Sequence, residues 1–271
     1  MTIGLVGCGL IGGSIGLACR ANGHHVTGVD SNPGSSKIAL ERGCVDVIGE
    51  LKEVAQSEII FICVPPKATA SLAEDVIALK SPESIISDCT SIKGPVVSWL
   101  KEHPNNRFIP GHPMAGHEKS GPKFASAWMF RGAKWILCPL KSTDKSALKK
   151  LEALISEMGA TPIRIDAQTH DRDVAYLSHL PHAIAASLVR LGARLDSVEA
   201  SAGSWKDLTR VGGVDPELWT QICMENRVEL CAAMAEMQKE WSLLSDALAA
   251  NDESAVRKFF VEAQSAKGES K

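Results

Sequence analysis

The sequence lacks the features that mark several special classes of protein. Its 29 basic and 32 acidic residues give a net charge of −3, so no excess of positive charge favours nucleic acid or an anionic membrane. No segment is apolar over the length that a membrane-spanning helix needs, and we find no internal repeat or low-complexity tract. The composition, 45% hydrophobic and 23% charged, predicts a soluble globular chain with no nucleic-acid or membrane partner.

The eight cysteines form neither a disulfide framework nor a metal motif. They are scattered along the chain without a CxxC pair or a zinc-like cluster. Most lie in apolar runs such as 60–64, where cysteine acts as a small hydrophobic residue. This usage is typical of a reducing compartment, so we expect a cytoplasmic protein without a metal site.

Up to Asp166, short apolar segments alternate with helical segments. The expected strands are 2–6, 25–30, 58–64, 84–88, 134–140 and 161–165, and the expected helices are 10–22, 33–42 and 96–102. This alternation predicts an α/β fold built on a parallel sheet with helices on both faces.

After Asp166 the composition changes to Ala, Leu, Met and Glu at helical spacing. We therefore expect a first domain over residues 1–166 and an all-helical domain over 167–271. Apolar residues between Ala232 and Leu248 mark a long amphipathic helix that begins near Pro216. Its Met-rich stripe indicates either core packing or the face of a homodimer, and we expect the homodimer because a small helical domain needs fewer apolar positions.

The segment 7–12 reads GCGLIG, a GxGxxG motif between an expected strand and an expected helix. In this context Gly7 permits a tight turn, Gly9 lets a pyrophosphate approach the backbone, and Gly12 lets helix and strand pack closely. The first domain is therefore expected to be of the Rossmann type. Asp30 ends the next strand and is placed to bind ribose hydroxyls, which favours NAD and leaves NADP possible. The other expected cofactor contacts are Leu10, Ile11, Val64 and Pro65.

His112 lies in the segment PGHPMAG, directly after the apolar residues Phe108 and Ile109. This position places it at the carboxyl edge of the sheet, where α/β proteins bind ligands. A histidine there can accept a hydroxyl proton while a hydride leaves the same carbon. Taken alone, such a histidine is equally often structural.

Two further polar groups follow in the helical region. His179 and His182 are three residues apart in SHLPH, but no carboxylate or cysteine at a ligand spacing supports a metal site. Arg210 precedes a flexible Gly pair and suits recognition of a carboxylate. A solvated surface arginine is the other interpretation.

The segments GCGLIGGS, SDCTSIKG, GHPMAGHEKSG, SHLPH and TRVGGVDPELW together resemble the TyrA family, the prephenate and arogenate dehydrogenases of tyrosine biosynthesis. They occur in order between about Thr2 and Arg227, over most of the chain. The resemblance implies a Rossmann domain followed by a helical dimerisation domain, with the active site between them. It also implies NAD(P)-dependent oxidative decarboxylation of prephenate or arogenate.

The resemblance assigns roles to individual residues. His112 would be the catalytic histidine that binds the ring 4-hydroxyl of the substrate, Ser91 would orient this histidine, and Arg210 would bind a substrate carboxylate. The remaining substrate-binding residues would be His179, His182 and Glu118.

Two other functions stay open from the residues alone. A β-hydroxyacid dehydrogenase would use a lysine in the helical domain, where Lys206 is the candidate, but it leaves the HPMAG segment unexplained. A non-catalytic NAD-binding module would leave His112, Ser91 and Arg210 without a role. The choice between prephenate and arogenate also stays open.

Overall fold

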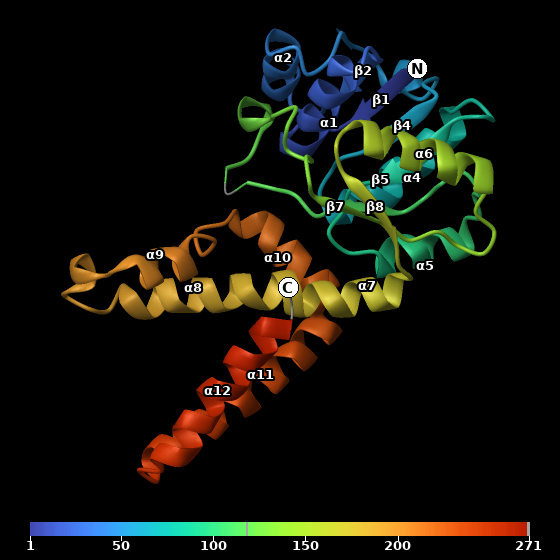
Figure 1. The fold of residues 1–271 in the computed structure, drawn as a ribbon. Helices are drawn as coiled ribbons and strands as arrows, with labels where there is room; N and C mark the ends of the chain where they lie inside the picture. The colour runs from blue at the N-terminus through green and yellow to red at the C-terminus, as the bar shows by residue number, and fades with distance from the viewer. Residues whose placement is uncertain (118, 270–271) are drawn as a thin grey trace.

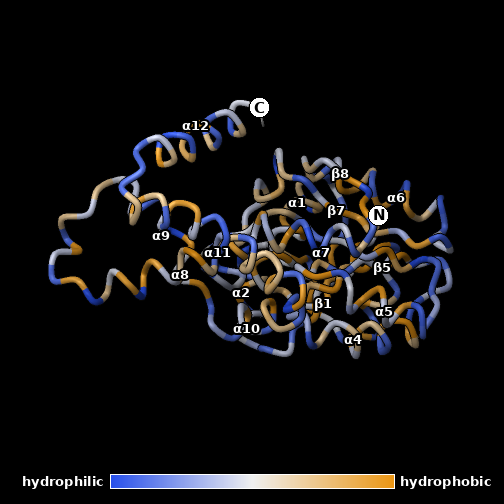
Figure 2. The backbone as a smooth tube through the Cα atoms, turned by 90° about the horizontal axis from the view of Figure 1, so that it is seen from below, coloured by the Kyte–Doolittle hydropathy of each residue, from blue (hydrophilic) through white to orange (hydrophobic). Residues whose placement is uncertain are grey.

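The computed structural model describes residues 1–117 and 119–269, which form an α/β part and a helical part (Figure 1). The α/β part contains the N-terminus, and two helical arms, α8–α9 and α11–α12, extend away from it. Hydrophobic residues gather inside the α/β part, whereas the arms are of mixed polarity (Figure 2). Among the described residues, no helix is both long and apolar enough to cross a membrane.

The larger sheet is parallel, with five strands in the order β3-β2-β1-β4-β5. Its strands are β1 (Thr2–Val6), β2 (His25–Val29), β3 (Val47–Ile48), β4 (Ile59–Ile62) and β5 (Ile85–Asp88). The helices of this region are α1 (Leu10–Ala21), α2 (Pro33–Glu41), α3 (Leu51–Val54), α4 (Pro66–Leu79) and α5 (Gly94–Glu102). The strand order reverses between β1 and β4, so their carboxyl ends border the crevice in which such sheets bind ligands. The Rossmann-type prediction is confirmed.

Strand β4 shows why the residues on both faces of this sheet are apolar. Phe61 packs in a core cluster together with residues of α1 and α6 (Lys145–Glu157), while Ile60 and Ile62 face the cluster of α4 and α5. Because successive side chains of a strand point to opposite faces, a strand covered on both sides is apolar throughout.

A second, smaller sheet departs from the all-parallel expectation. Its strands are β6 (Gly111–Pro113), β7 (Lys134–Leu137) and β8 (Thr161–Arg164), and β6 runs antiparallel to β7. Just before β6, the N–H of Ile109 donates to the carbonyl of Ile86 (2.8 Å) and extends the larger sheet beyond β5. His112 therefore lies on β6, past the edge of the larger sheet.

The helical part has a small core of its own. It comprises α7 (Ala167–Val174), a π-helical turn (Ala175–His179), α8 (Leu180–Gly192), α9 (Gly203–Thr209), α10 (Pro216–Glu225), α11 (Arg227–Ala249) and α12 (Glu253–Glu269). Within the described residues, the buried hydrophobic cluster of this part consists of Ala175, Leu180, Leu230 and Ala233. Four side chains bury little surface for a unit of this length.

The single long helix expected from Pro216 onward is wrong, because the chain breaks at Asn226 into α10 and α11. The side chain of Asn226 is buried and its Nδ2 donates to the carbonyl of Asp171 (2.8 Å). Asparagine side chains compete with the helix for backbone hydrogen bonds and favour helix ends, so this tertiary contact overrides the helical periodicity of the sequence.

Candidate active site

The turn between β1 and α1 is shaped for a dinucleotide pyrophosphate. Gly7 has φ = 94°, a conformation that residues with a side chain rarely adopt. A Cβ atom at Gly12 would lie 2.0 Å from the carbonyl oxygen of Gly7, so only glycine permits this approach of helix to turn. A Cβ atom at Gly9 would meet no described atom within 4 Å. The first N–H groups of α1 therefore face an open groove, where a pyrophosphate is stabilised.

Asp30 is held beside this turn by two backbone hydrogen bonds. Its Oδ2 accepts from the N–H of Cys8 (2.7 Å) and its Oδ1 accepts from the N–H of Asn32 (2.8 Å). Asn32 caps α2 by accepting from Gly34 and Ser35, so Asp30 is not the cap of that helix. The carboxylate consequently lies at the carboxyl end of β2, next to the groove.

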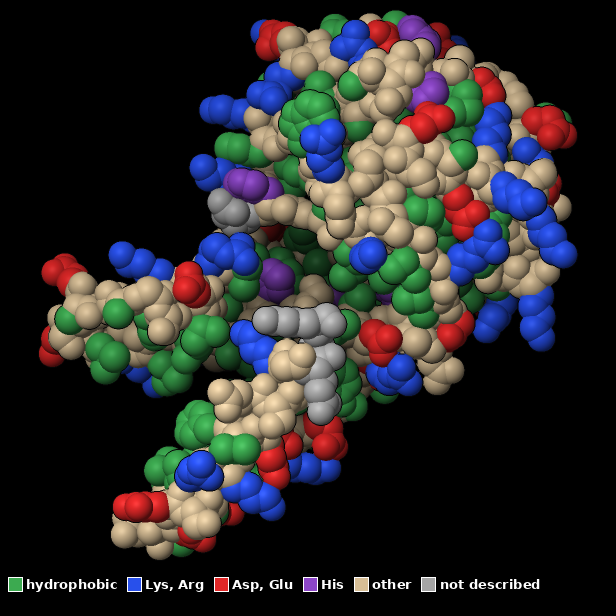
Figure 3. Space-filling model, in the orientation of Figure 1, with side chains coloured by type: hydrophobic (Ala, Val, Ile, Leu, Met, Phe, Trp, Pro, Cys, Tyr) green, Lys and Arg blue, Asp and Glu red, His purple; other side chains and the backbone are tan. Residues whose placement is uncertain are grey.

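A cavity of about 280 Å³ lies between the α/β part and the helical part. Its walls come from the start of α1, the residues that follow β4 and β5, and the start of α10. The surface is hollowed at this junction (Figure 3). The lining includes Leu10, Ile11, Val64, Pro65, Ser91, His117 and Trp219. The expected cofactor contacts after Gly9 and after β4 therefore line the same cavity as Ser91.

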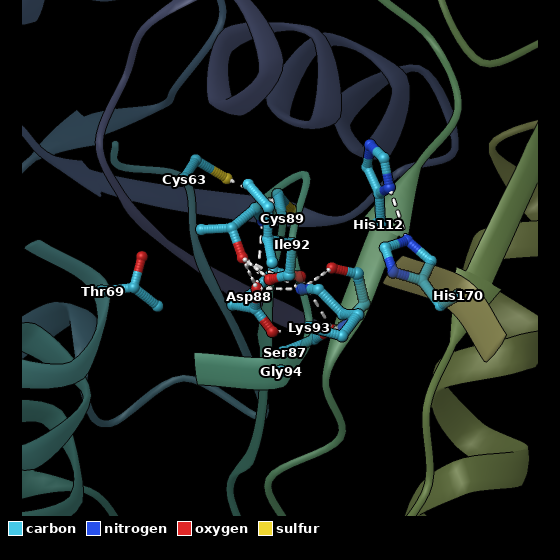
Figure 4. A network of polar contacts seen from close by, with 12 residues as sticks. Cys63, Thr69, Ser87, Asp88, Cys89, Ile92, Lys93, Gly94, His112 and His170 are labelled. Carbon is cyan, nitrogen blue, oxygen red and sulfur yellow. Dashed lines mark hydrogen bonds and ion pairs between the residues drawn. The ribbon is translucent and has the colours of Figure 1, made fainter. Parts of the chain in front are cut away.

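His112 is buried, with 8% of its surface exposed, and contacts a histidine from the helical part. Its Nδ1 lies 2.9 Å from Nε2 of His170, and Nδ1 of His170 lies 2.6 Å from Oδ1 of Asp171 (Figure 4). His170 and Asp171 belong to α7. Burial lowers the pKa of His112 well below its usual 6.5, so the ring is neutral at neutral pH.

A buried ion pair holds the backbone that leads to His112. Lys93 and Asp88 pair with each other, and neither side chain has exposed surface. Nζ of Lys93 donates to the carbonyl of Gly111 (2.6 Å), and the N–H of Gly111 donates to Oδ1 of Asp88 (3.2 Å). The residue before His112 is therefore anchored to the end of β5, as Figure 4 shows for the side chains of this network.

The two histidines of SHLPH lie against Trp219. The ring of His182 stacks on this indole with 4.0 Å between centroids, and His179 meets it edge-on at 6.1 Å. Nδ1 of His179 lies 3.1 Å from the Nδ2 group of Asn226 and accepts its hydrogen bond, so the proton of the neutral ring is on Nε2. That buried Nε2 has no hydrogen-bond partner among the described residues. Burial lowers the pKa of His179 to about 4.

The structure does not bring every expected residue to the cavity, because His112, His179 and His182 are not among its described lining residues. Arg210 is exposed at the end of α9 and is not among the lining residues, and no described residue pairs with it. Ser91 lines the cavity, but the hydrogen bond of Nδ1 of His112 goes to His170. Glu118 lies outside the described residues.

The sequence reasoning missed Asp88, Lys93, His170, Asp171 and Trp219. Asp88 and Lys93 belong to the segment SDCTSIKG, and Trp219 is the last residue of TRVGGVDPELW. Their place in two of the segments that carry the family resemblance could have marked them as site residues. The adjacent pair His170-Asp171 at the start of the helical part was a further signal.

Two family models cover most of the chain. Residues 15–164 match the model described as prephenate dehydrogenase, nucleotide-binding domain, and residues 166–262 match prephenate dehydrogenase, dimerization domain.

Curated relatives and solved structures agree with these models. The chain is 32% identical over 251 residues to a prephenate dehydrogenase of Bacillus subtilis (88% of this chain, 68% of the relative). It is 30% identical over 278 residues to a cyclohexadienyl dehydrogenase of Zymomonas mobilis (98% and 94%). Its fold is similar to that of prephenate dehydrogenase from A. aeolicus in complex with hydroxyphenyl propionate and NAD+, with a TM-score of 0.92, 28% identity and coverage of 100% and 98%. For arogenate dehydrogenase of Synechocystis the TM-score is 0.85, with 27% identity and full coverage of both chains.

Proposed function

Because the chain belongs to the TyrA family of prephenate and arogenate dehydrogenases and is an NAD-dependent oxidoreductase, we propose that it oxidatively decarboxylates a cyclohexadienol of the prephenate or arogenate type. The observation that carries this proposal is a buried, neutral histidine, His112, anchored to the same segment (88–93) that lines the cavity beside the dinucleotide turn. A non-catalytic NAD-binding module has no need of such a group. A β-hydroxyacid dehydrogenase would need Lys206, which lies on α9, in the arm that extends away from the α/β part (Figure 1).

The groove beside α1 fits NAD, because Gly9 leaves space for a pyrophosphate and Asp30, beside the same turn, would bind the ribose hydroxyls. Bound NAD supplies the hydride acceptor. His112 accepts the proton of the ring 4-hydroxyl as the hydride leaves the same carbon. The resulting dienone loses CO2 from its quaternary carbon, and the electron pair of the broken bond enters the ring and makes it a phenolate. The proton held by His112 returns to this oxygen and gives the phenol.

The other residues position the substrate. We assign Ser91 to the wall next to the reacting ring, Arg210 to the binding of a substrate carboxylate, and Glu118 to substrate binding. His179 carries a buried Nε2–H without a described partner, which supports a hydrogen bond from it to the substrate. His182 stacks on Trp219, a residue of the cavity wall, and thereby shapes the pocket.

The direct test is an assay of the purified protein with both substrates and both cofactors. We expect reduced cofactor and CO2 from prephenate, arogenate or both, and no turnover of 3-hydroxyacids. Turnover of 3-hydroxyacids alone would assign the chain to the β-hydroxyacid dehydrogenases, and NAD binding without any turnover would make it a binding module.

Asp30 is expected to favour NAD over NADP by at least about tenfold in kcat/KM, because its carboxylate faces the extra 2′-phosphate of NADP. Asp30→Ser should narrow or reverse this ratio. Asp196→Ser, at an exposed position of the α8–α9 arm, is the control and should leave it unchanged. A wild-type preference for NADP would contradict this role of Asp30.

Arg210→Ala is expected to raise KM by about tenfold or more with a smaller change in kcat. The variant loses a charge-assisted hydrogen bond, worth about 1.5–3 kcal/mol, to the substrate carboxylate. Steady-state kinetics measure the effect, and Arg194→Ala, at another exposed position of the same arm, is the control. An unchanged KM in a folded variant would assign Arg210 to the surface.

We further propose that the protein is a cytoplasmic C2 homodimer. Each chain would have a dinucleotide-binding domain over residues 1–166 and a substrate-binding and dimerisation domain over residues 167–271. The arms expose large apolar side chains that their own small core does not cover, including Leu195, Leu208, Val228, Leu243 and Phe260. The dimerization-domain match lies in the same region. Light scattering at micromolar concentration should give twice the 28.9 kDa chain mass, and a monomeric mass would contradict the proposal.

A further inference from the structure

We propose that Asp171 and His170 act as positioning residues that hold the proton of neutral His112 on Nδ1, so that its Nε2 is the proton acceptor. This inference rests on the proposed function for its catalytic meaning. The arrangement of protons itself follows from the hydrogen bonds of three buried side chains.

The first step is the state of Asp171. Its Oδ1 accepts from the backbone N–H of Lys93 (2.7 Å), and its Oδ2 accepts from the N–H of Gly94 (2.6 Å). Each oxygen thus already accepts a backbone N–H, and a carboxylate offers acceptors only. The contact of 2.6 Å between Oδ1 and Nδ1 of His170 therefore requires a proton on that nitrogen.

The second step concerns the hydrogen bond between His170 and His112. A neutral His170 with its proton on Nδ1 has an unprotonated Nε2, which is an acceptor. Nδ1 of His112, 2.9 Å away, must then donate. The proton of neutral His112 is thus on Nδ1, and Nε2 keeps the lone pair that can accept the proton of a substrate hydroxyl.

The charges around His112 support this assignment. Lys93, His170 and His179 are the neighbours that lower the pKa of His112 in addition to burial. Lys93 is paired with Asp88, so Asp171 is the carboxylate that remains to balance a positive charge. When His112 accepts a proton, its charge is stabilised through His170 by Asp171. His112 belongs to the α/β part and Asp171 to the helical part. The general base therefore has all its partners only when α7 packs against the α/β part.

Asp171→Leu provides the test. Leucine offers no acceptor to Nδ1 of His170, so nothing holds the proton of His170 on that nitrogen. The proton then moves to Nε2 of His170, which donates to Nδ1 of His112 and leaves the proton of His112 on Nε2, the wrong nitrogen. We expect kcat to fall by on the order of 10²–10⁴-fold with KM nearly unchanged. Asp173→Asn, on the same helix, removes only a surface pair with Arg172 and is the control.

Long-range ¹H–¹⁵N spectra of histidine-labelled protein report the tautomer without any substrate. The His112 signal, assigned by its loss in His112→Asn, should show a protonated Nδ1 in the wild type and a protonated Nε2 in Asp171→Leu. Since these spectra do not depend on turnover, they separate a failure of this inference from a failure of the proposed function.

Variants of His170 leave the contacts of Asp171 with α5 intact. His170→Gln can place an amide oxygen opposite Nδ1 of His112 and should keep its tautomer and more activity than His170→Phe, which offers no acceptor. The inference is overturned if wild-type His112 carries its proton on Nε2. It is equally overturned if Asp171→Leu keeps the wild-type tautomer, if its tautomer changes while kcat does not, or if the Gln and Phe variants lose activity alike.

Discussion

Replacing His112 by asparagine is expected to lower kcat by on the order of 10²–10⁴-fold, the usual contribution of a general base. Asparagine keeps a polar group of similar size on β6 but cannot take up a proton from the substrate. The cofactor groove is formed by the β1–α1 turn and not by β6, so the dissociation constant of NAD should change little. Stopped-flow or steady-state assays of cofactor reduction, together with NAD titration, measure both quantities. Near-normal turnover would remove His112 from the mechanism.

The pH dependence of the wild-type enzyme provides a second measure of the same residue. Burial lowers the pKa of His112, so its basic form persists below pH 6.5. The acidic limb of kcat/KM should therefore lie below pH 6.5, and it should disappear from the residual activity of His112→Asn. His103→Asn alters an exposed histidine that stacks on Trp99 and should leave the profile unchanged. An acidic limb that survives in His112→Asn would belong to another group.

Lys93→Met is expected to lower the free energy of unfolding by about 3–5 kcal/mol, because it leaves the buried carboxylate of Asp88 without its counter-charge. The change also removes the hydrogen bond to the carbonyl of Gly111, next to His112, so kcat should fall in the protein that remains folded. Equilibrium urea denaturation and activity at a temperature well below the transition measure the two effects.

Two further variants isolate the charge. Lys93→Met combined with Asp88→Asn removes the unpaired carboxylate and should recover part of the lost stability. Lys239→Met breaks an exposed ion pair with Glu236 and should leave the free energy of unfolding nearly unchanged. If Lys93→Met is no more destabilising than Lys239→Met, the buried pair is not important for folding.

The parts of the fold that follow from local patterns were predictable. Strand β1 begins and ends where the sequence predicts, and the glycines of the following turn have the geometry that their spacing indicates. These features depend on residues within a few positions of one another. The same holds for α2, where a proline near the first turn and Gly43 after the end mark both limits.

The parts that depend on distant contacts were not predictable. Asn226 interrupts a helical pattern because its side chain reaches Asp171, 55 residues earlier. His170 belongs to a helix with few apolar residues and becomes significant only when α7 brings it to His112, 58 residues away. Spacing along a chain does not show which segments meet across a domain junction.

The contact of Asp171 with the first N–H groups of α5 also limits how this chain can be recombined with its relatives. A chimera that joined residues 1–166 to a foreign helical part would have to keep a histidine and an acidic residue at the positions of His170 and Asp171. Otherwise the first N–H groups of α5 would lose the carboxylate that accepts their hydrogen bonds. The start of α5 would then be destabilised although no residue of the α/β part had been replaced. For this reason, the first turns of α7 should be transferred with the α/β part.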